Sequence, residues 1–123
     1  QIGTRFALTE ESSASPVFKD YCLSLGEGDT KLLLKKLAPT RLVKNAFREA
    51  VEKAEDSGAS AEDLRTLLGR GRAKKGIFEG DLEEGELEIG QVSAIISRRQ
   101  SVAEVMDELV AAYQRAAKKD YLF

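Results

Sequence analysis

The residues of this chain that could do chemistry lie in three short stretches. Gly3 and Thr4 stand at the end of an expected strand and could hold a phosphate, because glycine lets the backbone approach an anion closely and threonine adds a hydroxyl. Gly90 and Gln91 place an amide side chain, with two donors and one acceptor, beside another glycine. Each pair is also an ordinary structural feature, a turn after a strand in one case and the start of a helix in the other.

The third stretch is basic, since four of the six residues from Arg70 to Lys75 carry a positive charge. It could dock an acidic partner by charge complementarity, although a solvated surface is the simpler interpretation. The acidic stretch from Glu79 to Glu88 lacks the alternating carboxylates of a calcium-binding loop. We therefore predict no metal site.

The chain contains no histidine and a single cysteine, Cys22. No internal disulfide can form, and the commonest acid–base side chain is missing. Cys22 is expected to be a buried apolar residue. If the chain belongs to an enzyme, its chemistry comes from a cofactor or from residues outside these 123, so no catalytic residue is predicted.

Composition limits the class of protein. Hydrophobic residues make up 42% and charged residues 33% of the 123 residues, which suits one small folded domain. The 19 basic and 21 acidic side chains leave a net charge of -2, so no overall field attracts nucleic acid or an anionic membrane. No apolar run reaches the roughly 18 residues of a membrane-spanning helix. We expect a soluble, cytoplasmic protein.

The elements that must position these residues are mostly helical. The stretch from Gln1 to Leu8 is expected to be the end of a buried strand running into a glycine turn. Ser15 and Pro16 then predict a helix start, with a buried face at Phe18, Cys22 and Leu25 and an end at Gly26 or Gly28. Residues 29–45 are expected to form two short extended pieces around Pro39.

Three later helices are predicted from caps and apolar spacing. One begins near Asn45 and ends at Gly58, and a second follows the capping box of Ser60 and Asp63. The strongest pattern predicts a helix from about Ser101 to Lys118, with one apolar face along it. A lone strand among helices cannot satisfy its own backbone groups. We therefore expect the partners of the first strand to lie upstream, in a longer polypeptide.

Several motifs, taken in order, resemble one family. They are GTRF, TEESSASP followed by Phe18 and Lys19, then Asp29 with Thr30, TRLVKN, and GRAKKGIFEGDLEEGELEIGQVSAII. Together they resemble the C-terminal part of the flavin-dependent enoyl-acyl-carrier-protein reductase II and nitronate monooxygenase family. The resemblance extends from Gln1 to about Leu109.

The resemblance implies an α/β fold, namely the C-terminal part of a (β/α)8 TIM barrel that carries FMN, followed by a mostly helical extension. Residues 1–28 would be the last strand, its phosphate loop and a helix, residues 29–45 the extended pieces, and residues 46–123 the helical extension. Gly3 and Thr4 would cradle the flavin phosphate with Gln1 close by, and Gly90 and Gln91 would line the site. The catalytic histidine of the family would lie upstream.

The resemblance also implies a function. The reductase branch uses NADH or NADPH to reduce FMN and then an enoyl thioester carried by acyl carrier protein, in fatty acid synthesis. The expected partners are that carrier-bound substrate and the upstream part of the same polypeptide. A second copy of the protein, in a homodimer, is a further option. Two alternatives also stay open: a nitronate monooxygenase that oxidises alkyl nitronates with oxygen, and a free-standing helical interaction module without a cofactor.

Overall fold

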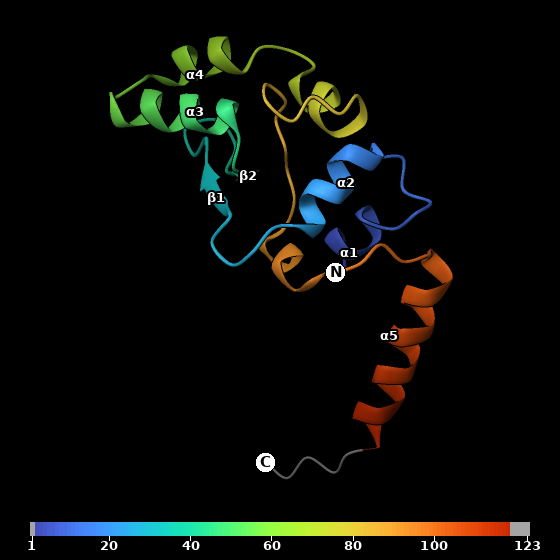
Figure 1. The fold of residues 1–123 in the computed structure, drawn as a ribbon. Coiled ribbons are helices and arrows are strands. Elements are labelled where there is room, and N and C mark those ends of the chain that lie inside the picture. The colour runs from blue at the N-terminus through green and yellow to red at the C-terminus, as the bar shows by residue number, and fades with distance from the viewer. Residues whose placement is uncertain (1, 119–123) are drawn as a thin grey trace, which may run out of the picture.

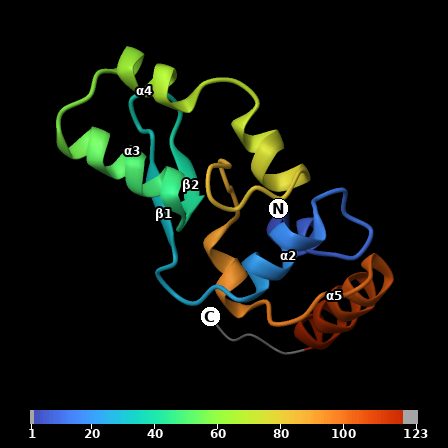
Figure 2. The same ribbon diagram turned by 45° about the horizontal axis from the view of Figure 1, so that its top comes forward.

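The computed structural model describes residues 2–118, so Gln1 and residues 119–123 lie outside the description. The chain is an α/β structure in which helices predominate (Figure 1). The elements in order are α1 (Thr4–Ala7), α2 (Pro16–Leu23), β1 (Thr30–Leu33), β2 (Thr40–Val43), α3 (Ala46–Asp56), α4 (Ala61–Leu68), η1 (Lys74–Phe78), η2 (Gln91–Ile95) and α5 (Val102–Ala117). In both views, α3 and α4 lie at one end and α5 at the other (Figures 1 and 2).

The first element corrects the expected strand from Gln1 to Leu8. The residues Thr4–Ala7 form a short helix instead, in which the Ala7 amide donates to the Gly3 carbonyl at 3.0 Å and the Leu8 amide to the Thr4 carbonyl at 3.2 Å. Among the described residues no strand lies beside this stretch to accept its backbone groups, because the sheet consists of β1 and β2. Local helical bonds satisfy those carbonyls in its place.

Helix α2 confirms the predicted start and buried face. The Ser15 hydroxyl accepts a hydrogen bond from the Phe18 amide at 3.1 Å, and Pro16 occupies the first helical position. Phe18, Cys22 and Leu25 are buried as expected. The helix ends at Leu23, earlier than the predicted glycines, because the Ser24 hydroxyl donates to the Tyr21 carbonyl at 2.6 Å and closes the last turn.

The two predicted extended pieces form an antiparallel hairpin of β1 and β2, with Thr30 opposite Val43 and Leu33 opposite Thr40. The outer edge of β2 is covered by the acidic stretch. The Val43 amide donates to the Leu87 carbonyl at 2.9 Å, and Leu42 forms a bridge with Glu88. This pairing directs the chain from the hairpin toward Gly90.

Side-chain caps begin the later helices as the sequence predicts. The Asn45 side chain accepts from the Arg48 amide at 2.9 Å, and the capping box of Ser60 and Asp63 is complete. The Asn45 amide group also donates to the Leu82 and Gly85 carbonyls, at 3.1 and 2.8 Å. One side chain therefore starts α3 and anchors the acidic stretch to it.

Helix α5 confirms the strongest prediction, beginning after the Ser101 cap, whose hydroxyl accepts from the Glu104 amide at 3.1 Å. Its apolar face is largely uncovered: Val105 is buried, whereas Met106 is 46% and Tyr113 74% exposed. The helix projects away from the rest of the chain (Figure 1).

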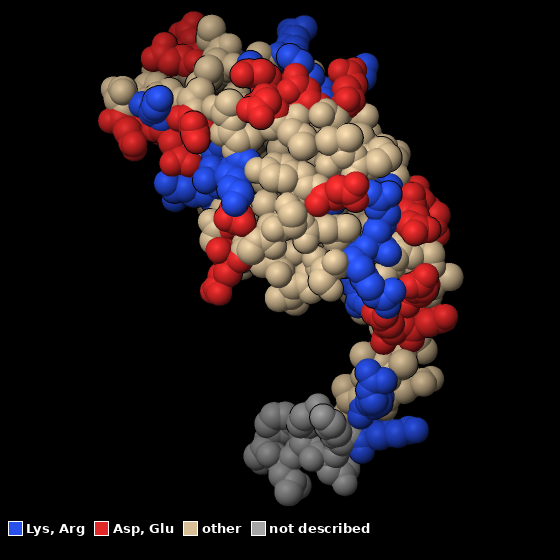
Figure 3. Space-filling model, in the orientation of Figure 1, with Lys and Arg blue, Asp and Glu red and all other residues tan. Residues whose placement is uncertain are grey.

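The face of the molecule seen in Figure 1 is mixed in charge. Figure 3 shows acidic and basic side chains interleaved around a broad uncharged area on this face. No helix in residues 2–118 is both long and apolar enough to cross a membrane.

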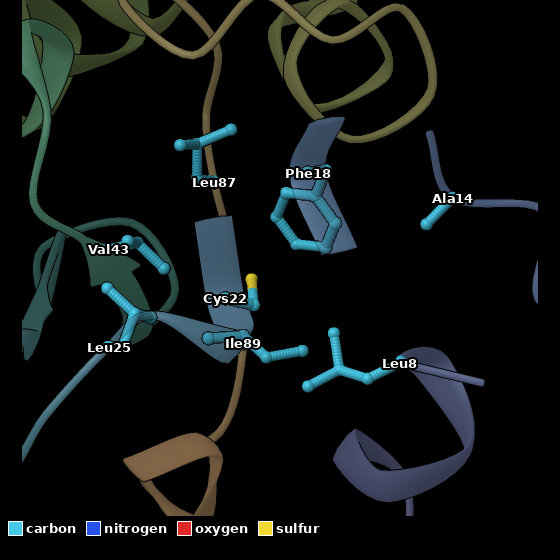
Figure 4. Packing of buried hydrophobic residues seen from close by; sticks show 8 residues of the cluster. All are labelled: Leu8, Ala14, Phe18, Cys22, Leu25, Val43, Leu87 and Ile89. Atoms are coloured by element: carbon cyan, nitrogen blue, oxygen red, sulfur yellow. The ribbon is translucent and has the colours of Figure 1, made fainter. Parts of the chain in front are cut away.

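The apolar core has two parts. The α2 core gathers Leu8, Ala14, Phe18, Cys22, Leu25, Val43, Leu87 and Ile89. Figure 4 shows these side chains converging from α2 and the segments on either side of it, from β2 and from the extended stretch after Gly85. The α3–α4 core is formed by Leu33, Leu34, Leu42, Phe47, Val51 and Leu64. Because Leu42 and Val43 are neighbours in β2, this strand contributes to both cores from its two faces.

Candidate functional site

The structure brings together two of the predicted site residues that are 86 positions apart. The Gly90 amide donates a hydrogen bond to the Thr4 hydroxyl oxygen at 3.0 Å. Thr4 begins α1, and Gly90 precedes η2, so this bond joins two elements that are in contact. The predicted phosphate turn and the predicted glycine–glutamine pair therefore meet at one point.

The contact between Thr4 and Gly90 leaves little room for a side chain at position 90. Its backbone is extended, with φ -70° and ψ 153°, a conformation that any residue adopts. A Cβ atom on Gly90 would lie 2.4 Å from the Thr4 hydroxyl oxygen, far inside van der Waals contact. Any side chain at position 90 would therefore displace the Thr4 hydroxyl and break its hydrogen bond with the Gly90 amide.

Gly3, the residue before Thr4, has an exposed backbone. No heavy atom lies within 4 Å of where a Cβ on Gly3 would stand, and the residue is exposed. Within the described residues the amides of Gly3, Thr4 and Arg5 donate no hydrogen bond, as holds for the first amides of any helix. These donors, with the Thr4 hydroxyl, offer an open polar surface to an anionic oxygen.

A hollow of about 620 Å³, which we call the α1–α5 hollow, opens beside these donors. Its lining combines Gly3 and the polar residues Thr4, Arg5 and Glu108 with the apolar side chains of Val92, Ile95, Ile96 and Leu109. Such a combination suits a ligand with an anionic end and a flat or apolar body.

Charged side chains at the mouth of this hollow are paired with each other. Glu108 of α5 forms an ion pair with Arg5 and accepts a hydrogen bond from the Gln100 amide group at 2.7 Å. Arg98 lies 3.4 Å from Glu104 and 3.5 Å from Glu108. This network fixes α1 against α5. The sequence did not suggest this network, because Arg5 and Glu108 are 103 residues apart and the GTRF motif gives no sign of which distant residue Arg5 meets.

A second hollow of about 460 Å³, the α1–β2 hollow, is lined by Thr4, by Pro39, Thr40 and Arg41 from the hairpin, and by residues 88–90. Thr4 lines both hollows, whereas Gly90 lines only this second one.

Two other predicted site residues are not part of this arrangement. Gln91 is exposed at the start of η2 and lines neither hollow. Gln1 lies outside the described residues. The geometry therefore gathers Gly3, Thr4 and Gly90, with Arg5 as an addition that the sequence did not suggest.

The basic stretch from Arg70 to Lys75 is mostly engaged within the chain. Arg72 donates to the Leu68, Glu84 and Leu67 carbonyls at 2.8, 2.7 and 3.1 Å, and its guanidinium stacks 4.4 Å from the centre of the Phe47 ring. Lys74 and Lys75 lie 3.7 and 3.4 Å from the carboxylates of Glu79 and Asp81. Among the described residues Arg70 has no ion pair. Most of the positive charge expected to face a partner is balanced by the acidic stretch.

Two buried groups have shifted acidities. Cys22 is completely buried, as predicted, and burial raises the pKa of its thiol to about 12, so it carries no thiolate at neutral pH. Burial also raises the pKa of Glu86, to about 8, with a further contribution from the neighbouring Glu88 and an opposing one from Arg72. Glu86 lies in the stretch that leads to Gly90 but lines neither hollow.

Comparison with solved structures identifies the fold. FabK from Thermotoga maritima, a TIM-barrel protein, superimposes with a TM-score of 0.83 and 24% sequence identity, covering 96% of this chain and 37% of that chain. A point-mutant form of the same FabK gives 0.75 and 23%, covering 96% and 35%. The chain thus has the α/β fold of the C-terminal part of a TIM-barrel protein and spans about a third of the length of the structures it matches.

The sequence itself also matches a known family. The family model described as nitronate monooxygenase covers residues 1–112, which include both hollows and the contact between Thr4 and Gly90. The match therefore includes all the predicted site residues as well as α1 to α4. The chain belongs to the nitronate monooxygenase family.

Proposed function

We propose that the complete protein is an FMN-dependent oxidoreductase whose flavin phosphate is held at Gly3 and Thr4. The observation that carries this proposal is the open backbone there, where the amides of Gly3, Thr4 and Arg5 have no acceptor among residues 2–118 and lie beside a threonine hydroxyl. A phosphate has several oxygens that accept such donors, and glycine lets it approach. The α1–α5 hollow next to these donors has the mixed polar and apolar lining that a flavin needs.

The fold supports this position of the phosphate. TIM-barrel enzymes commonly bind phosphate with the loops after strands 7 and 8 and a short extra helix. Helix α1 has four residues and lies within the stretch, Gln1 to Leu8, that the resemblance implies as the end of the last barrel strand. The bound flavin would supply hydride or electron transfer. The residues of this chain would bind its phosphate, orient it and exclude water from one side.

For the reaction, we propose reduction of an enoyl thioester by NADH or NADPH. Support comes from the resemblance of VKN (Val43 to Asn45) and of the EGD stretch that begins at Glu79 to the reductase branch of the family. Oxidation of alkyl nitronates with oxygen is the second candidate, and the family match favours it. Since the chain supplies no histidine, the acid–base residue of either reaction would come from elsewhere in the complete protein.

The two candidate reactions differ in the compound that accepts electrons from the flavin, and this difference can be measured. With the complete protein and FMN under anaerobic conditions, a reductase consumes NADH or NADPH only when an enoyl thioester such as crotonyl coenzyme A is added. In a second assay in air-saturated buffer, a nitronate monooxygenase instead takes up oxygen when an alkyl nitronate is added and needs no nicotinamide. Nitronate turnover without enoyl reduction would replace our first candidate by the second, and a protein that binds no flavin would reject both.

Acyl carrier protein is the proposed partner of the basic stretch from Arg70 to Lys75. The contacts that Arg72 makes within the chain limit which of these residues can be changed in a test. Arg72 must be left in place, because its loss would disturb the fold. Changing Arg70, Lys74 and Lys75 together to Ala is expected to raise KM for carrier-bound substrate and to leave KM for a small thioester unchanged. Equal changes for both substrates would reject docking at this stretch.

We also propose that the rest of the same polypeptide covers the apolar face of α5. Met106, Val110 and Tyr113 form a stripe at helical spacing, and Ile95 of the neighbouring η2 is 81% exposed. A helix with one apolar stripe needs a layer to pack against. Limited proteolysis of the complete protein should leave α5 intact, and rapid cleavage within it would contradict this arrangement.

A further inference from the structure

We propose that a small hollow between α4 and η1, the α4–η1 hollow, binds a phosphate group between the side chains of Arg70, Arg72 and Lys75. It lies away from α5 in both views and shares no lining residue with the α1–α5 and α1–β2 hollows (Figures 1 and 2). The inference rests on the docking proposed for the basic stretch only for the source of that phosphate. It does not depend on the flavin site.

The charge around this hollow is the first observation. It has a volume of about 230 Å³, and its lining includes Arg70, Arg72, Lys75, Glu84 and the backbone of Gly69 and Gly71. Three of these side chains are positive and one is negative, in a chain whose net charge is -2. A phosphate monoester carries about −1.5 to −2 charges at pH 7 and would balance this excess. Pockets for whole small molecules measure roughly 300–1,000 Å³, so the hollow suits a single group.

Arg72 provides a positive wall that is already fixed. Its guanidinium donates to three backbone carbonyls, those of Leu67, Leu68 and Glu84. It also stacks on the Phe47 ring, 4.4 Å from the ring centre. The three bonds leave further N–H groups of the guanidinium unused. Because the side chain is held by packing, it loses little conformational freedom when it donates to a phosphate oxygen.

Arg70 and Lys75 can turn toward the hollow. Arg70 is exposed and has no ion pair within residues 2–118. The Lys75 ammonium lies 3.4 Å from the Asp81 carboxylate, and the Lys75 side chain is about half exposed. An exposed ion pair of this kind contributes little to stability, so a phosphate with more negative charge can take the place of Asp81.

The wall between these cations is backbone without side chains. Gly69 and Gly71 have φ values of 66° and 73°, in the left-handed region where a residue with a side chain is strained. No heavy atom lies within 4 Å of where a Cβ atom on either glycine would stand. An anion can therefore approach this part of the chain closely.

A solvated basic surface without an anion site is the competing explanation. We would record the amide NMR signals of Gly69 and Gly71 in the complete protein with FMN present, while inorganic phosphate is added at constant ionic strength. A site predicts that both signals shift and that the shift saturates with phosphate concentration. These signals report on the α4–η1 hollow, whatever binds at Thr4. No shift, or a drift that does not saturate, would reject the site.

Variants within the basic stretch identify the side chains that bind. Arg70→Gln and Lys75→Gln should each weaken phosphate binding about tenfold, because each removes a charged donor. Lys74→Gln is the matched control, since Lys74 is exposed and carries the same charge but does not line the hollow. It should change the affinity by less than about twofold, because solvent and salt screen its charge. Equal losses for Lys74→Gln and Lys75→Gln would assign the effect to overall charge and reject the site.

Glu84→Gln should act in the opposite direction. The Glu84 carboxylate is the negative group of the lining and lies 3.6 Å from the Arg72 guanidinium. The substitution keeps the backbone carbonyl to which Arg72 donates and removes the charge that repels an anion. We expect phosphate binding to become severalfold stronger. Unchanged or weaker binding would contradict a site in this hollow.

The source of the phosphate has an experiment of its own, which separates this inference from the proposed docking. Acyl carrier protein holds its thioester on an arm attached through a phosphate. The carrier with its arm should displace inorganic phosphate from the hollow, and the carrier without it should not. If inorganic phosphate binds but the complete carrier does not displace it, the site stands with a free phosphate ester as its ligand, and the docking is wrong. If the KM test supports docking but phosphate never shifts the Gly69 and Gly71 signals, the docking stands and this inference is wrong.

Discussion

The two ends of this chain differ in how completely they bury their own apolar side chains. At one end, α3 and α4 close a core with the hairpin, and Phe47, Val51 and Leu64 are almost inaccessible. At the other end, α1, η2 and α5 surround a hollow, and the apolar residues of α5 and η2 are largely exposed. The first end is stabilised by residues of this chain alone. The second end has the polar and apolar surfaces that a ligand and a further layer of protein would use.

The largest effect should follow from opening the closed core. Phe47→Ala removes a ring that packs against α4 and lies under the Arg72 guanidinium. Loss of a buried aromatic side chain typically costs about 3–5 kcal/mol of unfolding free energy. Urea denaturation of the complete protein would measure it, provided that the transition of this region is resolved. A loss below about 1 kcal/mol would mean that this core contributes little.

Arg72 should rank next, because it holds the closed core to the acidic stretch. Arg72→Ala leaves the carbonyls at the end of α4 without their donors, and we expect a loss of about 2–3 kcal/mol in the same measurement. Arg70→Ala is the matched control, two residues away, exposed and without an ion pair among the described residues. It should change stability by less than about 0.5 kcal/mol. Similar losses for both would refute the structural role of Arg72.

The open end predicts a smaller effect that depends on context. Met106→Ala removes an apolar side chain of α5 that is about half exposed in this structure. If another layer covers this face in the complete protein, the loss should reach about 2 kcal/mol or more, as for a buried methionine. Were the face to remain in solvent, the change would stay within about 0.5 kcal/mol. The comparison with Phe47→Ala would then show whether the two ends are equally closed in the complete protein.

The last prediction concerns the pH dependence that Glu86, in the acidic stretch, gives to stability. Burial raises the pKa of Glu86 to about 8, so the folded state binds a proton that the unfolded state, with a pKa near the usual value of about 4.3, has released. Stability should therefore decrease as pH rises from about 5 to 8. Glu86→Gln, which keeps the shape and stays neutral, should flatten this dependence in unfolding curves recorded across that range. An unchanged slope would assign the dependence to other groups.

Local patterns predicted most of the elements and only part of the site. The caps at Ser15, Asn45, Ser60 and Ser101 act over three residues, so the sequence reveals them directly. The short helix α1 was missed, because its residues also suit a strand and no nearby residue distinguishes the two. Gly3, Thr4 and Gly90 were candidates from the resemblance, while the participation of Arg5 was not predictable from any local pattern.

The sequence by itself determined where helices and the hairpin begin, which faces are apolar, and that the chain has no histidine to act as a base. Only the tertiary structure decided which distant residues meet. The contact of Thr4 with Gly90 and the ion pair of Arg5 with Glu108 join positions 86 and 103 residues apart, and the docking of Arg72 on Phe47 joins two helical segments across the closed core. Caps and periodicity arise from hydrogen bonds a few residues apart, whereas these contacts exist only after the two cores have packed and brought the segments together.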